Sequence, residues 1–204
     1  MTGSHGDIID LFAGVEPGEA LDRLRRGRSV TRENAEASFR ALFEPTDPKS
    51  LTPLERFAIA AFVALLHESG KAADFYADEL RQRNPKVAET VLREAQQAQA
   101  TGPFGNYPAG PLSNENTTGI IYYVSRAARA FLGERLAAGL DHAHLLVFHP
   151  RDASPEDHQR LLDTNWTTSD IVTLSQIVAF LSFQLRVVHG LDALAASGTE
   201  GTPS

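Results

Sequence analysis

Helix-start signals divide the chain into segments of helical length. Thr52-Pro53-Leu54-Glu55 places a hydroxyl, a Pro and a Glu in the order of a capping box, and Asn84-Pro85 and Ser154-Pro155 repeat the polar-residue-then-Pro order. Thr31 and Thr167 are looser starts of the same kind. Each start is followed by about 10–18 residues without another Pro, which is an ordinary helix length. The pattern predicts helices over 7–13, 16–26, 32–43, 53–67, 70–83, 85–100, 117–131, 133–148, 155–163 and 168–188.

The same pattern indicates an all-α fold with a single helical domain over 7–194. Alternating apolar and polar runs joined by Asn-Gly or Asp-Gly turns are absent from the sequence. The segments 54–66 and 171–188 are apolar on nearly every face, which is typical of a helix in the centre of a bundle or at a subunit interface. Residues 101–116 form the one long Gly- and Pro-containing loop, a lid or a linker. The small, polar ends 1–6 and 195–204 are expected to be disordered.

Composition excludes several classes of function. The 204 residues contain no Cys, which excludes disulfide, iron–sulfur and thiolate chemistry. With 19 Lys and Arg against 26 Asp and Glu, the formal net charge is -7, which argues against a nucleic-acid partner. Polar residues interrupt each apolar stretch and the first residues lack a signal-peptide pattern, so we expect no membrane partner and a cytoplasmic location.

Two stretches of the chain resemble a known superfamily. Residues 51–67, Leu-Thr-Pro-Leu-Glu-Arg-Phe-Ala-Ile-Ala-Ala-Phe-Val-Ala-Leu-Leu-His, resemble the central helix of the AhpD-like alkylhydroperoxidase and carboxymuconolactone decarboxylase superfamily. Residues 161–186, with Asp-Ile-Val near the start of a long helix, resemble its closing segment, and together the two cover about a quarter of the chain. The resemblance implies an AhpD-like helical bundle that forms a homo-oligomer, such as a dimer, trimer or hexamer.

The redox residues of the peroxidase branch are all replaced. That branch carries a Glu, then a Cys-x-x-Cys, then a His, and alignment on the Leu-x-Pro-Leu-Glu-Arg motif places these at Phe57, Ser69, Ala72 and Tyr76. Serine lacks the acidity of a thiol and Ala72 cannot form a disulfide. Phe57 cannot carry a proton, and a tyrosine, with a reference pKa near 10, is a poor proton carrier at neutral pH. Dithiol peroxide reduction is therefore excluded.

His67, Tyr76 and Glu55 are the candidates for other catalysis on this fold. His67 ends the apolar helix where the resemblance places the superfamily's pocket, and His is a natural base for proton transfer. Each residue also has a structural interpretation. His67 is a helix C-cap or a core histidine, Glu55 is a capping-box residue, Tyr76 is a packing residue, and Ser69 caps the next helix.

His142, His144 and His149 form the densest histidine group. The neighbouring residues favour a helix, on which His142 and His144 diverge by about 200° and His142 and His149 lie roughly 10 Å apart along the axis. A metal site would therefore need a further ligand such as His67. Alternatively, His149 binds carbonyl groups at a helix end, because Pro150 follows it.

Three functions remain open from the sequence. In the first, the chain is a cysteine-free relative that keeps a pocket for a small organic molecule. It would transfer a proton or catalyse decarboxylation through His67, together with Tyr76 or a histidine of the 142–149 group. Alternatively, it is an inactive oligomeric subunit that pairs with itself or with a thiol-bearing relative, its cavity filled by Phe57, Phe62 and Tyr76. The third function is a metal-dependent enzyme, and no organic cofactor is expected in any of the three.

Overall fold

The computed structural model describes residues 7–48, 50–68 and 70–199, and this part of the chain is entirely helical apart from loops and turns. Strands are absent from the described residues, where only an isolated bridge joins Gly105 and Thr117. The all-α prediction is confirmed. The elements are α1 (Ile8–Ala13), α2 (Ala20–Arg26), α3 (Ser29–Phe43), α4 (Pro53–Leu66), α5 (Gly70–Arg83), α6 (Pro85–Gln97), η1 (Pro111–Glu115), α7 (Arg126–Leu132), α8 (Glu134–Phe148), η2 (Pro150–Asp152), α9 (Pro155–Asp163) and α10 (Thr168–Thr199).

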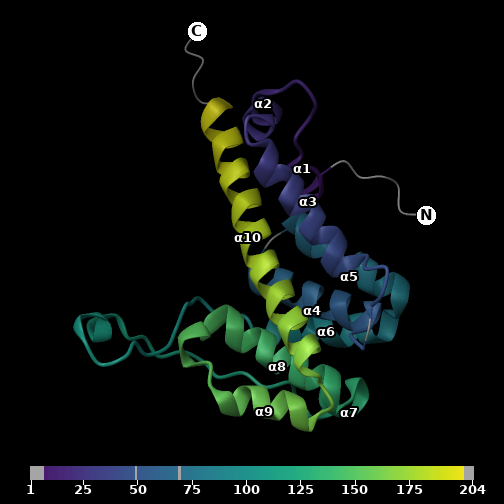
Figure 1. Ribbon diagram of the computed structural model, residues 1–204, viewed down its shortest axis with the longest axis vertical. Coiled ribbons are helices and arrows are strands. Elements are labelled where there is room, and N and C mark those ends of the chain that lie inside the picture. Colours follow the sequence, from purple (N-terminus) through teal and green to yellow (C-terminus); the bar gives the residue numbers. More distant parts are fainter. Residues whose placement is uncertain (1–6, 49, 69, 200–204) are drawn as a thin grey trace.

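Helix α4 is the centre of the fold, as its apolar sequence predicts. Its capping box is complete, because the Glu55 amide donates to Thr52 Oγ1 at 3.2 Å and the Thr52 amide donates to Glu55 Oε2 at 2.8 Å. From Glu55 to Leu66, every residue except Leu65 is buried. Helices α3, α5, α6, α8 and α10 surround it (Figure 1).

Helix α10 is longer than the sequence pattern predicts. It crosses the molecule from α8 and α9 at one end to α1 at the other (Figure 1). Residues 195–199, part of the end expected to be disordered, continue the helix, because Ala195 and Ala196 favour helix and no Pro intervenes. Residues 1–6 and 200–204 lie outside the described residues.

Residues 168–197 of α10 have the length and apolar composition of a membrane-crossing helix, despite the polar residues that interrupt them. The core helix of a soluble protein meets the same criterion, and 44% of the most apolar stretch is buried inside this chain. The absence of a membrane partner therefore stays a prediction.

The helices predicted over 16–26 and 117–131 are shorter in the structure. Helix α2 begins only at Ala20, because Pro17 and Gly18, whose φ is 86°, interrupt the chain. Residues 116–125 are not helical, and α7 starts at Arg126 after the cap Ser125, whose Oγ accepts from the Ala128 amide at 3.3 Å. The glycine and β-branched residues of 117–121 have low helix propensity, which contributes to the difference.

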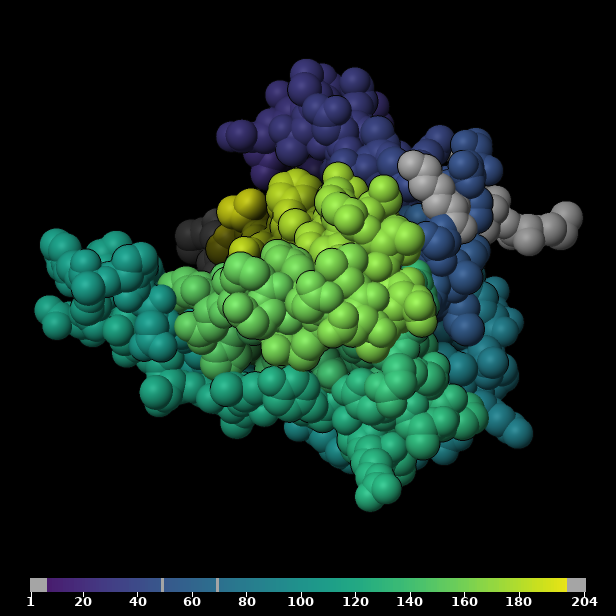
Figure 2. Space-filling model, turned by 60° about the horizontal axis from the view of Figure 1, so that its bottom comes forward, coloured from purple at the N-terminus to yellow at the C-terminus, as the bar shows by residue number. Residues whose placement is uncertain are grey.

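Residues 101–125, which we call the arm, leave the helical body after α6 and return to it before α7. Figure 1 shows the arm on the left in teal, and Figure 2 shows it standing away from the body beside α8 and α9. Its two limbs are joined where the Gly105 amide donates to the Thr117 carbonyl at 2.8 Å and the Thr117 amide donates back at 3.2 Å. The long loop predicted over 101–116 is confirmed as part of this arm.

Candidate functional site

The positions of the superfamily's redox residues lie in an aromatic part of the core. Tyr76 is fully buried, with ring centroids 5.4 Å from Phe43 and 6.5 Å from Phe57. Its hydroxyl donates to Gln184 Oε1 at 2.7 Å, and burial raises its pKa above the usual tyrosine value. Ala72 is also buried, while Ser69 lies outside the described residues. Phe62 is buried too, and its ring faces Tyr122 at 6.1 Å.

Glu55 is tied into the framework by both of its oxygens. Oε2 completes the capping box, and Oε1 accepts from Arg135 Nε of α8 at 2.8 Å. The guanidinium of Arg135 also lies 4.6 Å from the ring of Trp166. These contacts support the structural interpretation of Glu55 that the sequence left open.

His67 and Tyr76 contact residues that lie on different sides of α10. His67 caps α4, and its Nε2 lies 3.3 Å from Ser182 Oγ, whereas Tyr76 binds Gln184. Residues two apart on a helix diverge by about 200°. Burial lowers the pKa of His67, and the nearby charges of Arg186 and His189 lower it further. The sequence-based pairing of these two side chains in one cavity has no support in this arrangement.

The three histidines of the 142–149 group have separate partners. His142 and His144 lie on α8 and His149 caps its end, as the sequence predicts. His144 Nε2 is 3.0 Å from the Ala98 carbonyl, and His149 Nε2 is 2.8 Å from the Ile120 carbonyl. His142 Nε2 is buried without a hydrogen-bond partner. In the part of the chain that the structure describes, no group of three or more His, Asp or Glu residues is arranged to hold a metal ion.

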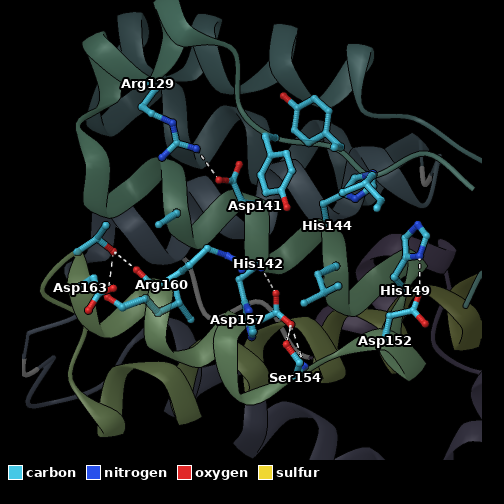
Figure 3. A pocket seen from close by; sticks show the side chains of 17 residues that line it. Arg129, Asp141, His142, His144, His149, Asp152, Ser154, Asp157, Arg160 and Asp163 are labelled. Atoms are coloured by element: carbon cyan, nitrogen blue, oxygen red, sulfur yellow. Dashed lines mark hydrogen bonds and ion pairs between the residues drawn. The ribbon is translucent and has the colours of Figure 1, made fainter.

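A pocket of about 550 Å³ lies beside these histidines, between α8, α9 and residues 121–123, and we call it the α8–α9 pocket (Figure 3). One part of its wall is apolar and another carries ionisable side chains. The lining residues are Ile121, Tyr122, Tyr123, Arg129, Ala138, Asp141, His142, His144, Leu145, His149, Asp152, Ser154, Asp157, Arg160, Leu161, Asp163 and Thr164.

Two carboxylates in the pocket wall are held by arginines. Asp141 Oδ2 accepts from Arg129 at 2.5 Å, and burial raises the pKa of Asp141 in spite of that contact. Asp157 pairs with Arg160 and accepts from the Ser154 amide at 2.8 Å and hydroxyl at 2.7 Å. Burial opposes the ionisation of Asp157, but these hydrogen bonds outweigh it and lower its pKa.

Two buried histidines of the pocket, His142 and His144, are neutral near pH 7. Burial lowers the pKa of His142 to about 4, and burial also lowers the pKa of His144 to about 4. Because the Ala98 carbonyl can only accept, the His144 proton lies on Nε2 and leaves Nδ1 as an acceptor. The pocket therefore contains uncharged imidazole nitrogens beside its charged pairs.

The wall formed by residues 121–125 is fixed by two carboxylates. Glu94 of α6, only 1% exposed, accepts from the Tyr122 hydroxyl at 2.6 Å and from the Ser125 amide and hydroxyl at 2.8 Å each. On the other side, Asp141 accepts from the Val124 amide at 2.7 Å. The returning limb of the arm is thereby held as a permanent side of the pocket.

Sequence reasoning found the histidines of this pocket but not its acidic and basic residues. Asp157 and Leu161 lie four residues apart on α9, so they share the face that turns toward α8. That spacing, together with the position of Asp141 next to His142, was the sequence feature that could have indicated the charged residues of the pocket. The contribution of 121–123 had no local signal, because those residues were expected to be helical.

Comparisons with known proteins do not identify the chain. Models of known protein families gave no match, and neither did a search of proteins with curated descriptions. The AhpD-like resemblance therefore rests on the two stretches quoted above. What the structure itself establishes is an all-helical fold over the described residues, with a histidine-containing pocket between α8, α9 and residues 121–123.

Proposed function

We propose that this chain is a cysteine-free, AhpD-like protein that binds a small organic molecule in the α8–α9 pocket. The observation that carries the proposal is His142. Its side chain is 4% exposed, lies in the pocket wall, and has a ring nitrogen without a partner. A buried polar group without a hydrogen bond costs about 1–3 kcal/mol, so a ligand or water that reaches it gains that free energy.

The pocket is the better ligand site because the family's redox position is filled. The rings of Phe43, Phe57 and Tyr76 pack together there, and the Tyr76 hydroxyl already has a partner. The α8–α9 pocket, in contrast, has the size typical of a small-molecule site, roughly 300–1,000 Å³.

Binding fits the chemistry of this pocket better than proton transfer or decarboxylation. An efficient general base has a pKa near the working pH. With a pKa of about 4, His142 is a weak base in neutral solution. Proton transfer through His67, the alternative from the sequence, would require a site at the α4–α10 contact, away from Tyr76.

A pocket-filling substitution tests the proposal. We expect Ala138→Leu, in the pocket wall, to weaken binding of small aromatic fragments detected by ligand-observed NMR by about tenfold or more. Ala179→Leu on the exposed surface of α10 is the matched control and should leave binding unchanged. If fragments bind both variants as tightly as the original chain, or if no fragment binds the original chain, the pocket is not the binding site.

A second candidate, an inactive oligomeric subunit, is supported by the outer surface of α10. Val172, Phe183 and Leu194 are 51%, 41% and 51% exposed and lie 11 residues apart, about three helical turns, so they share one face. An apolar helix face of this kind fits a homo-oligomer, whether a dimer, a trimer or a hexamer, or pairing with a thiol-bearing relative. Light scattering of Phe183→Glu, which should dissociate an oligomer, tests it. A monomeric original chain would contradict self-association.

A further inference from the structure

The α8–α9 pocket carries more negative than positive side chains. Four aspartates and two arginines line it, two of its buried histidines, His142 and His144, are neutral, and His149 lies against Asp152. Because the walls of a cleft focus the field of its charges, an excess of carboxylates selects against anions and favours cations. The aspartates are Asp141, Asp152, Asp157 and Asp163, and the arginines are Arg129 and Arg160.

Two of the four carboxylates are already neutralised. Asp141 pairs with Arg129 at 2.5 Å, and Asp157 pairs with Arg160. An ion pair of this kind presents little net charge to a ligand. The excess therefore comes from the remaining two aspartates, which lie toward opposite ends of the group of lining side chains in Figure 3.

Asp163 is the carboxylate that is left without a cation. Asp152 is occupied, since it lies 2.9 Å from His149 Nδ1 and accepts from the Asn106 amide at 3.0 Å. Within the described residues, the Asp163 carboxylate accepts a hydrogen bond only from the side-chain amide of Gln159, at 2.8 Å. Among the described residues, none places a Lys, Arg or His nitrogen within 4.0 Å of the Asp163 carboxylate.

The rest of the pocket matches a ligand that combines a hydrogen-bond donor with an apolar part. Ile121, Leu145 and Leu161 contribute aliphatic surface to the wall. His142, which lines the pocket, is more than nine-tenths buried, and its Nε2 has no hydrogen-bond partner. Hydrophobic surface, an unpartnered imidazole nitrogen and one unneutralised carboxylate are together the complement of an alkyl or arylalkyl amine.

Resting on the proposed binding function, we propose that the α8–α9 pocket selects a small organic cation, a protonated amine whose ammonium group pairs with Asp163. The apolar part of the amine lies against Ile121, Leu145 and Leu161. A carboxylate of the same shape is rejected, because it meets Asp163 without a compensating cation.

Three probes of one shape separate charge from size: phenethylamine, phenethyl alcohol and hydrocinnamate. Titration near neutral pH at low ionic strength, followed by NMR of the pocket residues, gives the three dissociation constants. Asp163 is exposed and partly screened by water, so we expect the amine to bind about tenfold more tightly than the alcohol. Added salt should reduce that preference. Asp163→Asn should remove it, and Asp192→Asn on the exposed side of α10 should not.

The outcomes distinguish the two proposals. Loss of the amine preference in Asp163→Asn alone supports the cation site. Equal binding of all three probes in the pocket, weakened by Ala138→Leu, overturns the charge selection and leaves the binding function standing. If none of the three probes shifts a pocket signal while unrelated fragments do, the cation proposal is again wrong. If no compound shifts a pocket signal, both proposals are wrong.

Discussion

Glu55 and Arg135 join the two buried helices α4 and α8, with Glu55 Oε1 accepting from Arg135 Nε at 2.8 Å. The same guanidinium lies 3.3 Å from Asp170 in the first turn of α10. Glu55 meanwhile caps α4 through its other oxygen. A residue that the sequence offered as a catalytic candidate thus links the starts of three helices.

We expect Glu55→Gln to lower the free energy of unfolding by about 1–2 kcal/mol, because it removes the charge from a largely buried ion pair and weakens the capping box. Urea denaturation measures this. Asp78→Asn is the control, since it breaks the exposed Asp78–Arg81 pair and should cost less than about 0.5 kcal/mol. A large loss of ligand binding with unchanged stability would contradict the structural role.

Tyr76→Phe is expected to destabilise the chain without affecting ligand binding. The change leaves the buried Oε1 of Gln184 without its donor, at a cost of about 1–3 kcal/mol. Thermal unfolding and fragment binding should be measured together. Tyr107→Phe on the arm serves as the control for stability. Impaired binding with normal stability would return Tyr76 to the list of site residues.

Stability should fall as the pH is lowered from about 6.5 to about 4. The folded chain holds His142 and His144 with a pKa of about 4, below their unfolded value. In this window the unfolded chain binds more protons, so each histidine costs up to about 3 kcal/mol as the pH falls. Above the unfolded pKa the contribution is complete, and below the folded pKa it is fully lost.

Urea denaturation at a series of pH values checks this dependence. His142→Gln should flatten the slope in that window, whereas His189→Gln on the exposed side of α10 should not. A slope that both variants leave unchanged would show that His142 does not carry the effect.

Gly139→Ala should destabilise the chain because α8 packs closely against Trp166. A Cβ at Gly139 would lie 2.5 Å from Trp166 Cζ2, so the indole or the helix must move, at about 1–3 kcal/mol. Gly190→Ala in α10 is the matched control, with nothing within 4 Å of its Cβ, and should stabilise by about 0.5–1 kcal/mol. Trp166 fluorescence reports both unfolding and any displacement of the ring, and equal effects of the two substitutions would contradict the packing argument.

Local signals predicted most of the helices. The capping box at Thr52 and the Asn84-Pro85 start mark helix beginnings that the structure reproduces. The non-helical run 117–125 was missed, because its conformation also depends on distant carboxylates, Glu94 and Asp141, that bind its hydroxyl and amide groups. The end of α10 was missed because a polar, small-residue composition was given more weight than the absence of a helix stop.

The sequence alone determined the helical class, the central position of α4 and the exclusion of thiol chemistry, since capping residues, periodicity and the absence of Cys are all local or compositional properties. Only the tertiary structure decided which polar side chains meet. In the tertiary structure, Glu55 accepts a hydrogen bond from Arg135, and His67 and Tyr76 have different partners. His142, Asp163 and Tyr123 line one pocket. Burial and contacts between residues distant in sequence set the charge of each group and decide whether it has a hydrogen-bond partner. Neither property can be read from the neighbouring residues along the chain.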